Sequence, residues 1–267
     1  MCVRMKRVML TVAYDGTNYS GWQIQPNNVT IEEVLNDHLS RLLGEEIRVI
    51  GASRTDAGVH ALGNVAVFDT NARIPGEKIS FAMNQRLPED IKILDSREVA
   101  ADFHPRKQKC RKIYEYKILN TIHPVPNYRL FTHFNYWKMD LSLMRKGAEY
   151  LVGEHDFASF CSVKTQALTT VRTVRSIDIQ KDEASSIITI RITGDGFLYN
   201  MVRIIAGTLM EVAEGKYPPE QVKDILDARS RSAAGPTAPA RGLTLIGMEF
   251  LEEKKEEDFS KKIPEKN

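Results

Sequence analysis

The chain has 267 residues of ordinary globular composition and a formal net charge of +2, which is enough material for one large domain or two small ones; this charge by itself does not indicate a nucleic-acid partner. Its longest apolar stretch contains Arg203 and Glu211, and its first residues lack the long apolar run of a secretion signal, so we expect no membrane span and a cytoplasmic protein. Three scattered cysteines and six histidines without ligand spacing predict neither a disulfide framework nor a metal site.

The first hundred residues predict the element order β-α-β-β-α-β. A strand is expected in VMLTVAYDG, ending in a turn at Asp15 and Gly16. A helix begins at the capping box of Thr30 and Glu33 and ends at Gly44. The remaining elements are two strands, EIRVIGA and NVAVFDT, a helix in PGEKISFAMNQRL and a strand in IKILDSREV.

From residue 111 onward the same order is predicted again, by pattern and not by sequence identity. Its elements are a strand in RKIYEYKIL, a helix in DLSLMRKGAEYLVG, strands in VRSIDIQ and SIITIRI, a helix in FLYNMVRIIAGTLMEVAEG and a strand in LTLIGMEFL, with an extra strand in FTHFNYW and an extra helix in PPEQVKDILDA. The repeat predicts an α+β fold of two ferredoxin-like βαββαβ halves, residues 1–105 and 106–250. Their antiparallel sheets would join edge to edge into one extended sheet, with the helices on one face and a central cleft between the halves. The charged, aperiodic tail, residues 251–267, is expected to be disordered.

An acidic residue among small ones marks residues 51–63, GASRTDAGVHALG, between two predicted strands. The small residues let the backbone turn sharply and let a ligand approach closely. Arg54 favours the ionised form of Asp56 if the two side chains meet. An ionised carboxylate in a tight pocket serves as a nucleophile or a base, but an Asp before Ala-Gly also commonly caps a turn. The stretch alone leaves both interpretations open.

A run of basic residues without an acid precedes two tyrosines, Tyr114 and Tyr116. The alternation of a strand places both tyrosines on one face. Such a run beside aromatic residues suits phosphate contacts and base stacking, although a solvated loop next to sheet-packing tyrosines has the same pattern. The basic residues are Arg106, Lys107, Lys109, Arg111 and Lys112.

A charged residue, Arg203, interrupts the apolar helix that is predicted near the C-terminus. Burying an unpaired guanidinium costs roughly several kcal/mol of free energy. Arg203 therefore needs a carboxylate or phosphate partner, unless it lies at the solvent-exposed edge of the helix.

Several stretches, in the same order and at the same spacing, resemble the tRNA pseudouridine synthase A (TruA) family. The likeness extends roughly from residue 6 to residue 250. The stretches are YDGTNYSGWQ, SRTDAGVHA, DFHPR, RKIYEY, GEHDFASF, FLYNMVR and TAPARGLTL.

The resemblance implies an enzyme that isomerises uridine to pseudouridine in RNA without a metal or cofactor. Asp56 matches the family's catalytic aspartate, which either attacks C1′ or helps to remove the 2′ proton, and the sequence does not choose between these routes. Tyr114 would lie against the flipped uracil. Arg54 and Arg203 would lie beside the aspartate or the flipped nucleotide, with an Asp56 to Arg203 pair that joins the two halves at the RNA-binding cleft.

The resemblance also implies a substrate and an assembly. Family members modify the anticodon stem-loop of tRNA, in bacteria at uridines 38 to 40, and act as homodimers in which one subunit presents the tRNA to the other.

Three alternatives stay open: a family member that acts on other RNA sites, a glycosidase-like enzyme that releases uracil, and an RNA-binding protein without catalysis.

Other residues receive weaker assignments. His60 is interpreted as structural or as a phosphate contact, Phe197 and Leu198 as neighbours of the pocket, and Phe157 and Phe160 as core residues. The sequence departs from the family pattern at three positions, where the family often has Arg, Gln and His. These positions are Ile24, Glu32 and Asn200.

Overall fold

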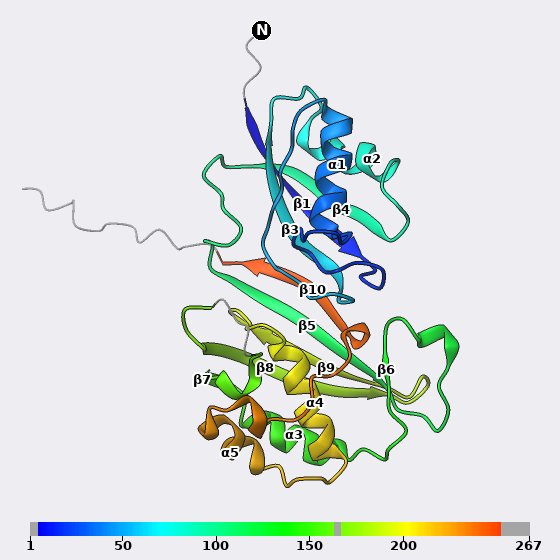
Figure 1. The fold of residues 1–267 in the computed structure, drawn as a ribbon, viewed down its shortest axis with the longest axis vertical. Helices are drawn as coiled ribbons and strands as arrows, with labels where there is room; N and C mark the ends of the chain where they lie inside the picture. Colours follow the sequence, from blue (N-terminus) through cyan, green and yellow to red (C-terminus); the bar gives the residue numbers. More distant parts are fainter. Residues whose placement is uncertain (1–4, 163–166, 252–267) are drawn as a thin grey trace, which may run out of the picture.

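The computed structural model describes residues 5–162 and 167–251 (Figure 1). The N-terminal half lies at the top of Figure 1 and the C-terminal half at the bottom, with β10 and β5 of the C-terminal half next to the join. Of the tail predicted to be disordered, residues 251–267, all but Leu251 lie outside the described residues.

The N-terminal half has the predicted order β-α-β-β-α-β. The Thr30 side chain caps the first helix by accepting a hydrogen bond from the Glu33 amide, and Gly44 ends it in the left-handed conformation, with φ of 69°. The elements are β1 (Lys6–Tyr14), α1 (Ile31–Leu43), β2 (Ile50–Gly51), β3 (His60–Thr70), α2 (Ile79–Asn84) and β4 (Ile91–Val99).

One predicted strand of this half is wrong for most of its length. Within EIRVIGA, β2 covers only Ile50 and Gly51. The amide of Ile47 donates to Ser40 Oγ (2.9 Å) and that of Val49 donates to Asn36 Oδ1 (2.8 Å), both on α1. Side chains of the helix thus take the donors that a strand would offer to its neighbour.

The C-terminal half repeats the order with insertions. Its elements are β5 (Cys110–Leu119), β6 (His133–Phe134), α3 (Leu141–Glu149), β7 (Gly153–Asp156), β8 (Val171–Asp182), β9 (Ile187–Gly194), α4 (Met201–Ala213), α5 (Gln221–Ala228) and β10 (Leu243–Phe250). The extra strand predicted in FTHFNYW is reduced to the two residues of β6. Helix α4 begins four residues later than predicted, because Asn200 before it has a positive φ of 62° that no helix continues.

Ten strands form one sheet in the order β4-β1-β3-β10-β5-β9-β8-β7, with β2 paired to β3 and β6 to β5. The strands of both halves follow the same order: β4-β1-β3-β2 in the first and β10-β5-β9-β8 in the second. The halves join where β10 pairs in parallel with β3, at Thr244 opposite His60 and Leu245 opposite Ala61. The prediction of an α+β chain with one extended, mainly antiparallel sheet is confirmed.

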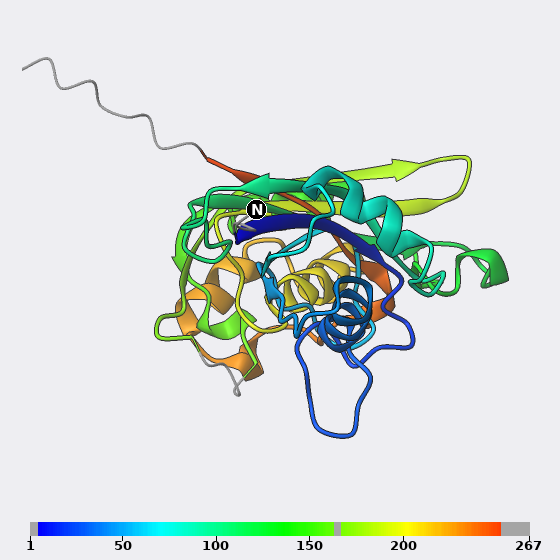
Figure 2. The ribbon, with the colours of Figure 1, turned by 90° about the horizontal axis from the view of Figure 1, so that it is seen from above.

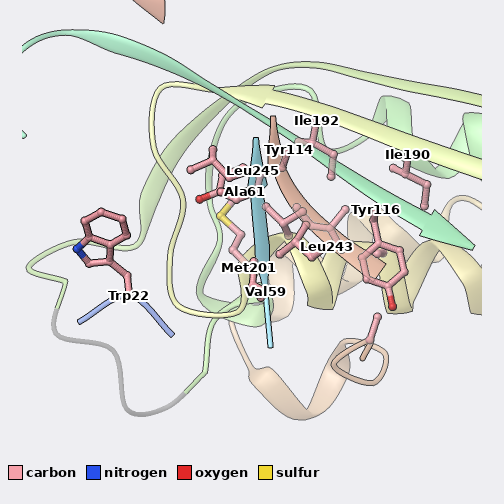
Figure 3. Close-up of a cluster of buried hydrophobic side chains, with 14 of the residues drawn as sticks. Trp22, Val59, Ala61, Tyr114, Tyr116, Ile190, Ile192, Met201, Leu243 and Leu245 are labelled. Carbon is pink, nitrogen blue, oxygen red and sulfur yellow. The ribbon is translucent and has the colours of Figure 1, made fainter. Parts of the chain in front are cut away.

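The helices and one face of the sheet share a single hydrophobic core. Buried residues of α1, α2, α3, α4 and α5 belong to the same cluster as those of β1 and β9. In Figure 2, α1 and α4 lie on the same side of the strands, and Figure 1 shows them in the upper and the lower half of the molecule. At the join, Figure 3 shows Val59, Ala61, Tyr114, Leu243 and Leu245 around Met201 of α4. In the described part of the chain, no helix is long and apolar enough to cross a membrane.

Candidate active site

A cleft of about 900 Å³ lies where the two halves meet. The N-terminal half contributes the loop between β2 and β3, with Asp56, and the C-terminal half contributes β5 and the segment that leads into α4. Among the residues that line it are Ser53, Arg54, Thr55, Asp56, Arg106, Lys112, Tyr114, Asp195, Phe197, Leu198 and Asn200.

Buried polar contacts fix the backbone of the Asp56 loop on both sides of the acid. The Thr55 hydroxyl lies 2.7 Å from the Tyr14 hydroxyl, and Asn64 Nδ2 donates to the Ser53 carbonyl oxygen (3.0 Å). The Trp22 amide donates to the Thr55 carbonyl oxygen (3.1 Å). All of these side chains are buried, so the loop that presents Asp56 is held by hydrogen bonds that water does not compete for.

Gly21 packs directly under this loop, and its replacement by Ala is expected to disturb it. Its φ is +88°, and an added Cβ would lie 2.6 Å from the Thr55 carbonyl oxygen. We expect Gly21→Ala to cost about 3 kcal/mol of unfolding free energy, from the left-handed backbone and the clash together, and to lower activity by displacing the residue next to Asp56. Urea unfolding and single-turnover kinetics measure the two effects.

A matched control is Gly44→Ala at the end of α1. Gly44 also has a positive φ, +69°, but an added Cβ meets nothing within 4 Å. This variant should lose only about 1 kcal/mol and keep full activity. Equal losses in the two variants would show that the close packing under the loop is unimportant.

Asp56 of the N-terminal half meets Arg203 of α4, as the family resemblance implied. Arg203 Nη1 lies 3.5 Å from Asp56 Oδ2, and the two side chains are 17% and 19% exposed. Burial raises the pKa of Asp56 above its ordinary value of 3.8, and the Arg203 charge acts in the opposite direction. The carboxylate is thus partly desolvated, which makes it a stronger base and nucleophile than an aspartate in water.

Three further contacts direct the Arg203 guanidinium from the first turn of α4. Its Nε donates to the Ala238 carbonyl oxygen (2.7 Å) and its Nη1 donates to Asn200 Oδ1 (2.8 Å). Asn200 in turn donates from Nδ2 to Ser162 Oγ (2.8 Å). Arg203 is therefore a largely buried, oriented cation and not an exposed residue at the helix edge.

The raised pKa of Asp56 predicts that Asp56→Asn stabilises the protein at neutral pH. Because the folded state holds the Asp56 proton more tightly, the wild type loses stability as pH rises from the ordinary pKa to the raised one, and the loss is complete above that interval. Asn does not titrate. The melting temperature of the variant should exceed that of the wild type at pH 7, and the difference should shrink as pH falls through that interval; a lower melting temperature at pH 7 would contradict it.

Tyr114 lies beside this pair on β5. Its ring packs edge to face with Phe197, at 5.3 Å between centroids, and its hydroxyl is hydrogen-bonded to Ser53 Oγ (3.0 Å). Burial raises the pKa of Tyr114 to about 12, so the phenol is neutral at physiological pH. Tyr116, on the same face, is fully buried and donates to the Pro239 carbonyl oxygen (3.0 Å).

The remaining predicted cations separate into two groups. Arg54, Arg106 and Lys112 line the cleft. The other three basic residues, Lys107, Lys109 and Arg111, are exposed and are not among its lining residues. The basic run is therefore not one continuous surface of the cleft.

His60 is buried and lies away from the cleft. Its Nδ1 accepts a hydrogen bond from the Gly16 amide (3.1 Å), and its Nε2 donates to the Leu130 carbonyl oxygen (2.9 Å). These contacts favour the structural interpretation over a phosphate contact. Phe197 and Leu198 line the cleft, and Phe157 and Phe160 are fully buried in the core, as predicted.

Ser53 and the role of Asn200 were not found from the sequence. Ser53 lies within the motif that contains Asp56, but its partner Tyr114 is 61 residues away and has no local signal. A further contact joins two of the three positions that depart from the family pattern: Glu32 Oε2 accepts a hydrogen bond from the backbone amide of Ile24 (3.0 Å).

Comparisons with known proteins identify the family of the chain. Residues 10–106 and 148–250 match the family model described as tRNA pseudouridine synthase. The chain is 47% identical over 242 residues to tRNA pseudouridine synthase A of Thermoanaerobacter sp. (strain X514), which covers 91% of this chain and 98% of the relative. It is 46% identical over 242 residues to the protein of that name from Acetivibrio thermocellus, with the same coverage, and 46% identical over 241 residues to that from Clostridium acetobutylicum, with 90% and 98% covered. The chain belongs to the tRNA pseudouridine synthase family.

Proposed function

We propose that this protein isomerises uridine to pseudouridine in the anticodon stem-loop of tRNA, at positions 38 to 40, with Asp56 as the catalytic residue. One observation carries the proposal: a partly buried carboxylate, paired with Arg203, opens into a cleft of about 900 Å³ in a chain of this family. The N-terminal half, residues 1–105, supplies the acid. The C-terminal half, residues 106–250, supplies Tyr114 and Arg203.

The reaction breaks the bond from N1 to C1′, turns the uracil in the cleft and forms a bond from C5 to C1′, after which the proton on C5 leaves. Asp56 acts either by attacking C1′ to form an ester or by accepting the 2′ proton to give a glycal. Uracil leaves as an anion, so one carboxylate suffices, in contrast to the paired acids of many glycosidases. Within the described residues, the other carboxylate that lines the cleft is Asp195. Two nitrogens of the Arg175 guanidinium donate hydrogen bonds to its two oxygens.

The target base has to leave the stack of neighbouring RNA bases to reach Asp56, which costs roughly a few kcal/mol of free energy. Tyr114, held by Ser53 and Phe197, offers a fixed apolar surface at the position where the uracil would lie. Arg54 is exposed at the cleft, where it would lie beside the flipped nucleotide.

The substrate is recognised by shape and backbone charge more than by base edges, because neighbouring positions in many tRNAs have to be reached. We propose that the protein acts in the cytoplasm as a homodimer, in which one subunit presents the tRNA and the other modifies it. No cofactor or metal takes part in this mechanism.

The test is a map of pseudouridines in unmodified tRNA before and after treatment with the purified protein. We expect new pseudouridines at positions 38 to 40 and no free uracil. Free uracil would indicate a glycosidase-like enzyme, conversion elsewhere would indicate another RNA site, and binding without conversion would indicate an RNA-binding protein that is not an enzyme.

A further inference from the structure

Two basic side chains of the cleft are anchored on consecutive backbone carbonyl groups just before the catalytic loop. Arg106 Nε donates to the Gly51 carbonyl oxygen (2.7 Å). Lys112 Nζ donates to the Ala52 carbonyl oxygen (3.2 Å) and to Ser53 Oγ (3.3 Å). Both residues line the cleft. The two charges are thus held in place by uncharged acceptors, two carbonyl oxygens and a hydroxyl group.

Neither cation has a carboxylate partner in residues 5–162 and 167–251. Burial lowers the pKa of Lys112, Cys110 acts in the opposite direction, and the nearby charge of Arg106 lowers the pKa further. Burial and Arg54 likewise lower the pKa of Arg106, and Glu32 acts weakly in the opposite direction. Three like charges have therefore been brought together, at an energetic cost that a bound anion would offset.

The remaining donors of these two cations are available to such an anion. Within the described residues, Arg106 Nη1 and Nη2 make no hydrogen bond, so both are free to bind two oxygens of one phosphate. Because Arg106 Nε is tied to Gly51, the guanidinium is already oriented before a ligand arrives, and less conformational entropy is lost on binding.

The position of Lys112 relates this pair to the proposed target nucleotide. Lys112 precedes Tyr114 by two residues, so both side chains leave β5 on the same face. Ser53 Oγ is hydrogen-bonded to both of them. Lys112 therefore lies next to the surface on which the uracil would rest, and Arg106, bound to the carbonyl group that precedes the one bound by Lys112, lies beside it.

We propose that Arg106 and Lys112 form a subsite for a single backbone phosphodiester directly next to the target uridine. The inference rests on the proposed function for the identity of that uridine, and it goes further by selecting two of five basic residues and one phosphate. Lys107 and Arg111, which are exposed and do not line the cleft, add only general attraction to RNA.

The experiment replaces one phosphate at a time by an uncharged methylphosphonate in a synthetic anticodon stem-loop and measures binding to the wild type and to Arg106→Gln. In the wild type, one linkage flanking the target should lower affinity by about tenfold when neutralised. In Arg106→Gln the same replacement should lower affinity by only about threefold, because Lys112 is then the one remaining cation of the pair that contacts this phosphate. The slope of log affinity against log salt should also become shallower by about 0.7 to 0.9, the change expected for the loss of one phosphate contact.

Lys112→Gln is the second variant, and Lys107→Gln and Arg111→Gln are matched controls that remove the same charge outside the cleft. Both controls should keep the tenfold loss at the flanking linkage. Circular dichroism and thermal melting show whether Lys112→Gln is folded; if it is not, Arg106→Gln alone decides. An equal loss in the wild type and in Arg106→Gln at each linkage would overturn the subsite.

Pseudouridine formation by the wild type is measured in parallel on unmodified stem-loop. Conversion without coupling between Arg106 and any phosphate would refute the subsite and leave the proposed function intact. Coupling without conversion would refute the proposed function and support an RNA phosphate site in the cleft.

Discussion

Replacement of Asp56 by Asn is expected to lower pseudouridine formation at least about 10³-fold while tRNA binding stays within about tenfold. Asn has the shape of Asp but neither the negative charge that attacks C1′ nor the basicity that accepts the 2′ proton. Binding persists because phosphate contacts supply most of the affinity for RNA. Tritium release from tRNA labelled at C5 of uridine, under single-turnover conditions, and filter binding measure the two quantities.

Asp195→Asn is the matched control for this prediction. Asp195 also lines the cleft, but its carboxylate is bound by Arg175, so its neutralisation should leave turnover within about tenfold of the wild type. Comparable losses in both variants would mean that the cleft needs general negative charge and not a carboxylate at position 56. Undiminished turnover in Asp56→Asn would remove the residue from the mechanism altogether.

Local signals predicted much of the fold correctly. The capping box at Thr30 and the left-handed Gly44 set the limits of α1 within one residue, because both act through contacts inside the helix. The alternation along β5 placed Tyr114 and Tyr116 on the buried face, which is what the pleat of a strand requires. The repeated element order predicted one joined sheet.

Features that depend on contacts between distant residues were not predicted. The segment EIRVIGA has the composition of a strand, but Ser40 and Asn36 of α1 bind its amides. The parallel pairing of β3 with β10 joins residues almost 200 positions apart, and nothing in either strand specifies it. The start of α4 depends on the left-handed Asn200, which a side-chain pattern does not reveal.

The candidate site, like the fold, was predicted from the sequence only in part. Residues 51–63 alone left Asp56 either as a turn cap or as a reactive acid, and it was the family resemblance that favoured the second. Arg203 was noticed on physical grounds, since a cation in an apolar helix needs a partner, and the structure places it 3.5 Å from Asp56. The anchoring of Lys112 by Ser53 needs the folded chain, because the two residues are 59 positions apart.

Replacement of Arg203 by Gln is expected to lower activity about 10²-fold at neutral pH and to move the acid limb of the pH profile upward. Burial raises the pKa of Asp56, and the Arg203 charge is the main effect that opposes this increase. Without Arg203 the pKa rises further, so a larger share of Asp56 is protonated at a given pH and unable to act. Activity falls as pH decreases through the pKa of Asp56; this fall should therefore begin at a higher pH in the variant.

The pH profile separates this electrostatic role from a structural one. Arg203→Lys keeps the charge but loses the planar guanidinium that binds Asn200 and Ala238 together. The acid limb of its pH profile should therefore lie closer to the wild-type limb than the limb of Arg203→Gln does, even if the maximal rate of Arg203→Lys is low. Arg191→Gln, which removes an exposed guanidinium paired with Glu115 away from the cleft, controls for net charge and should leave the limb in place. A single-turnover rate that drops in Arg203→Gln without a shift of the limb would show that Arg203 orients the cleft and does not set the ionisation of Asp56. A shift in the predicted direction, together with rates that recover toward high pH, would tie the loss to the proton on one carboxylate.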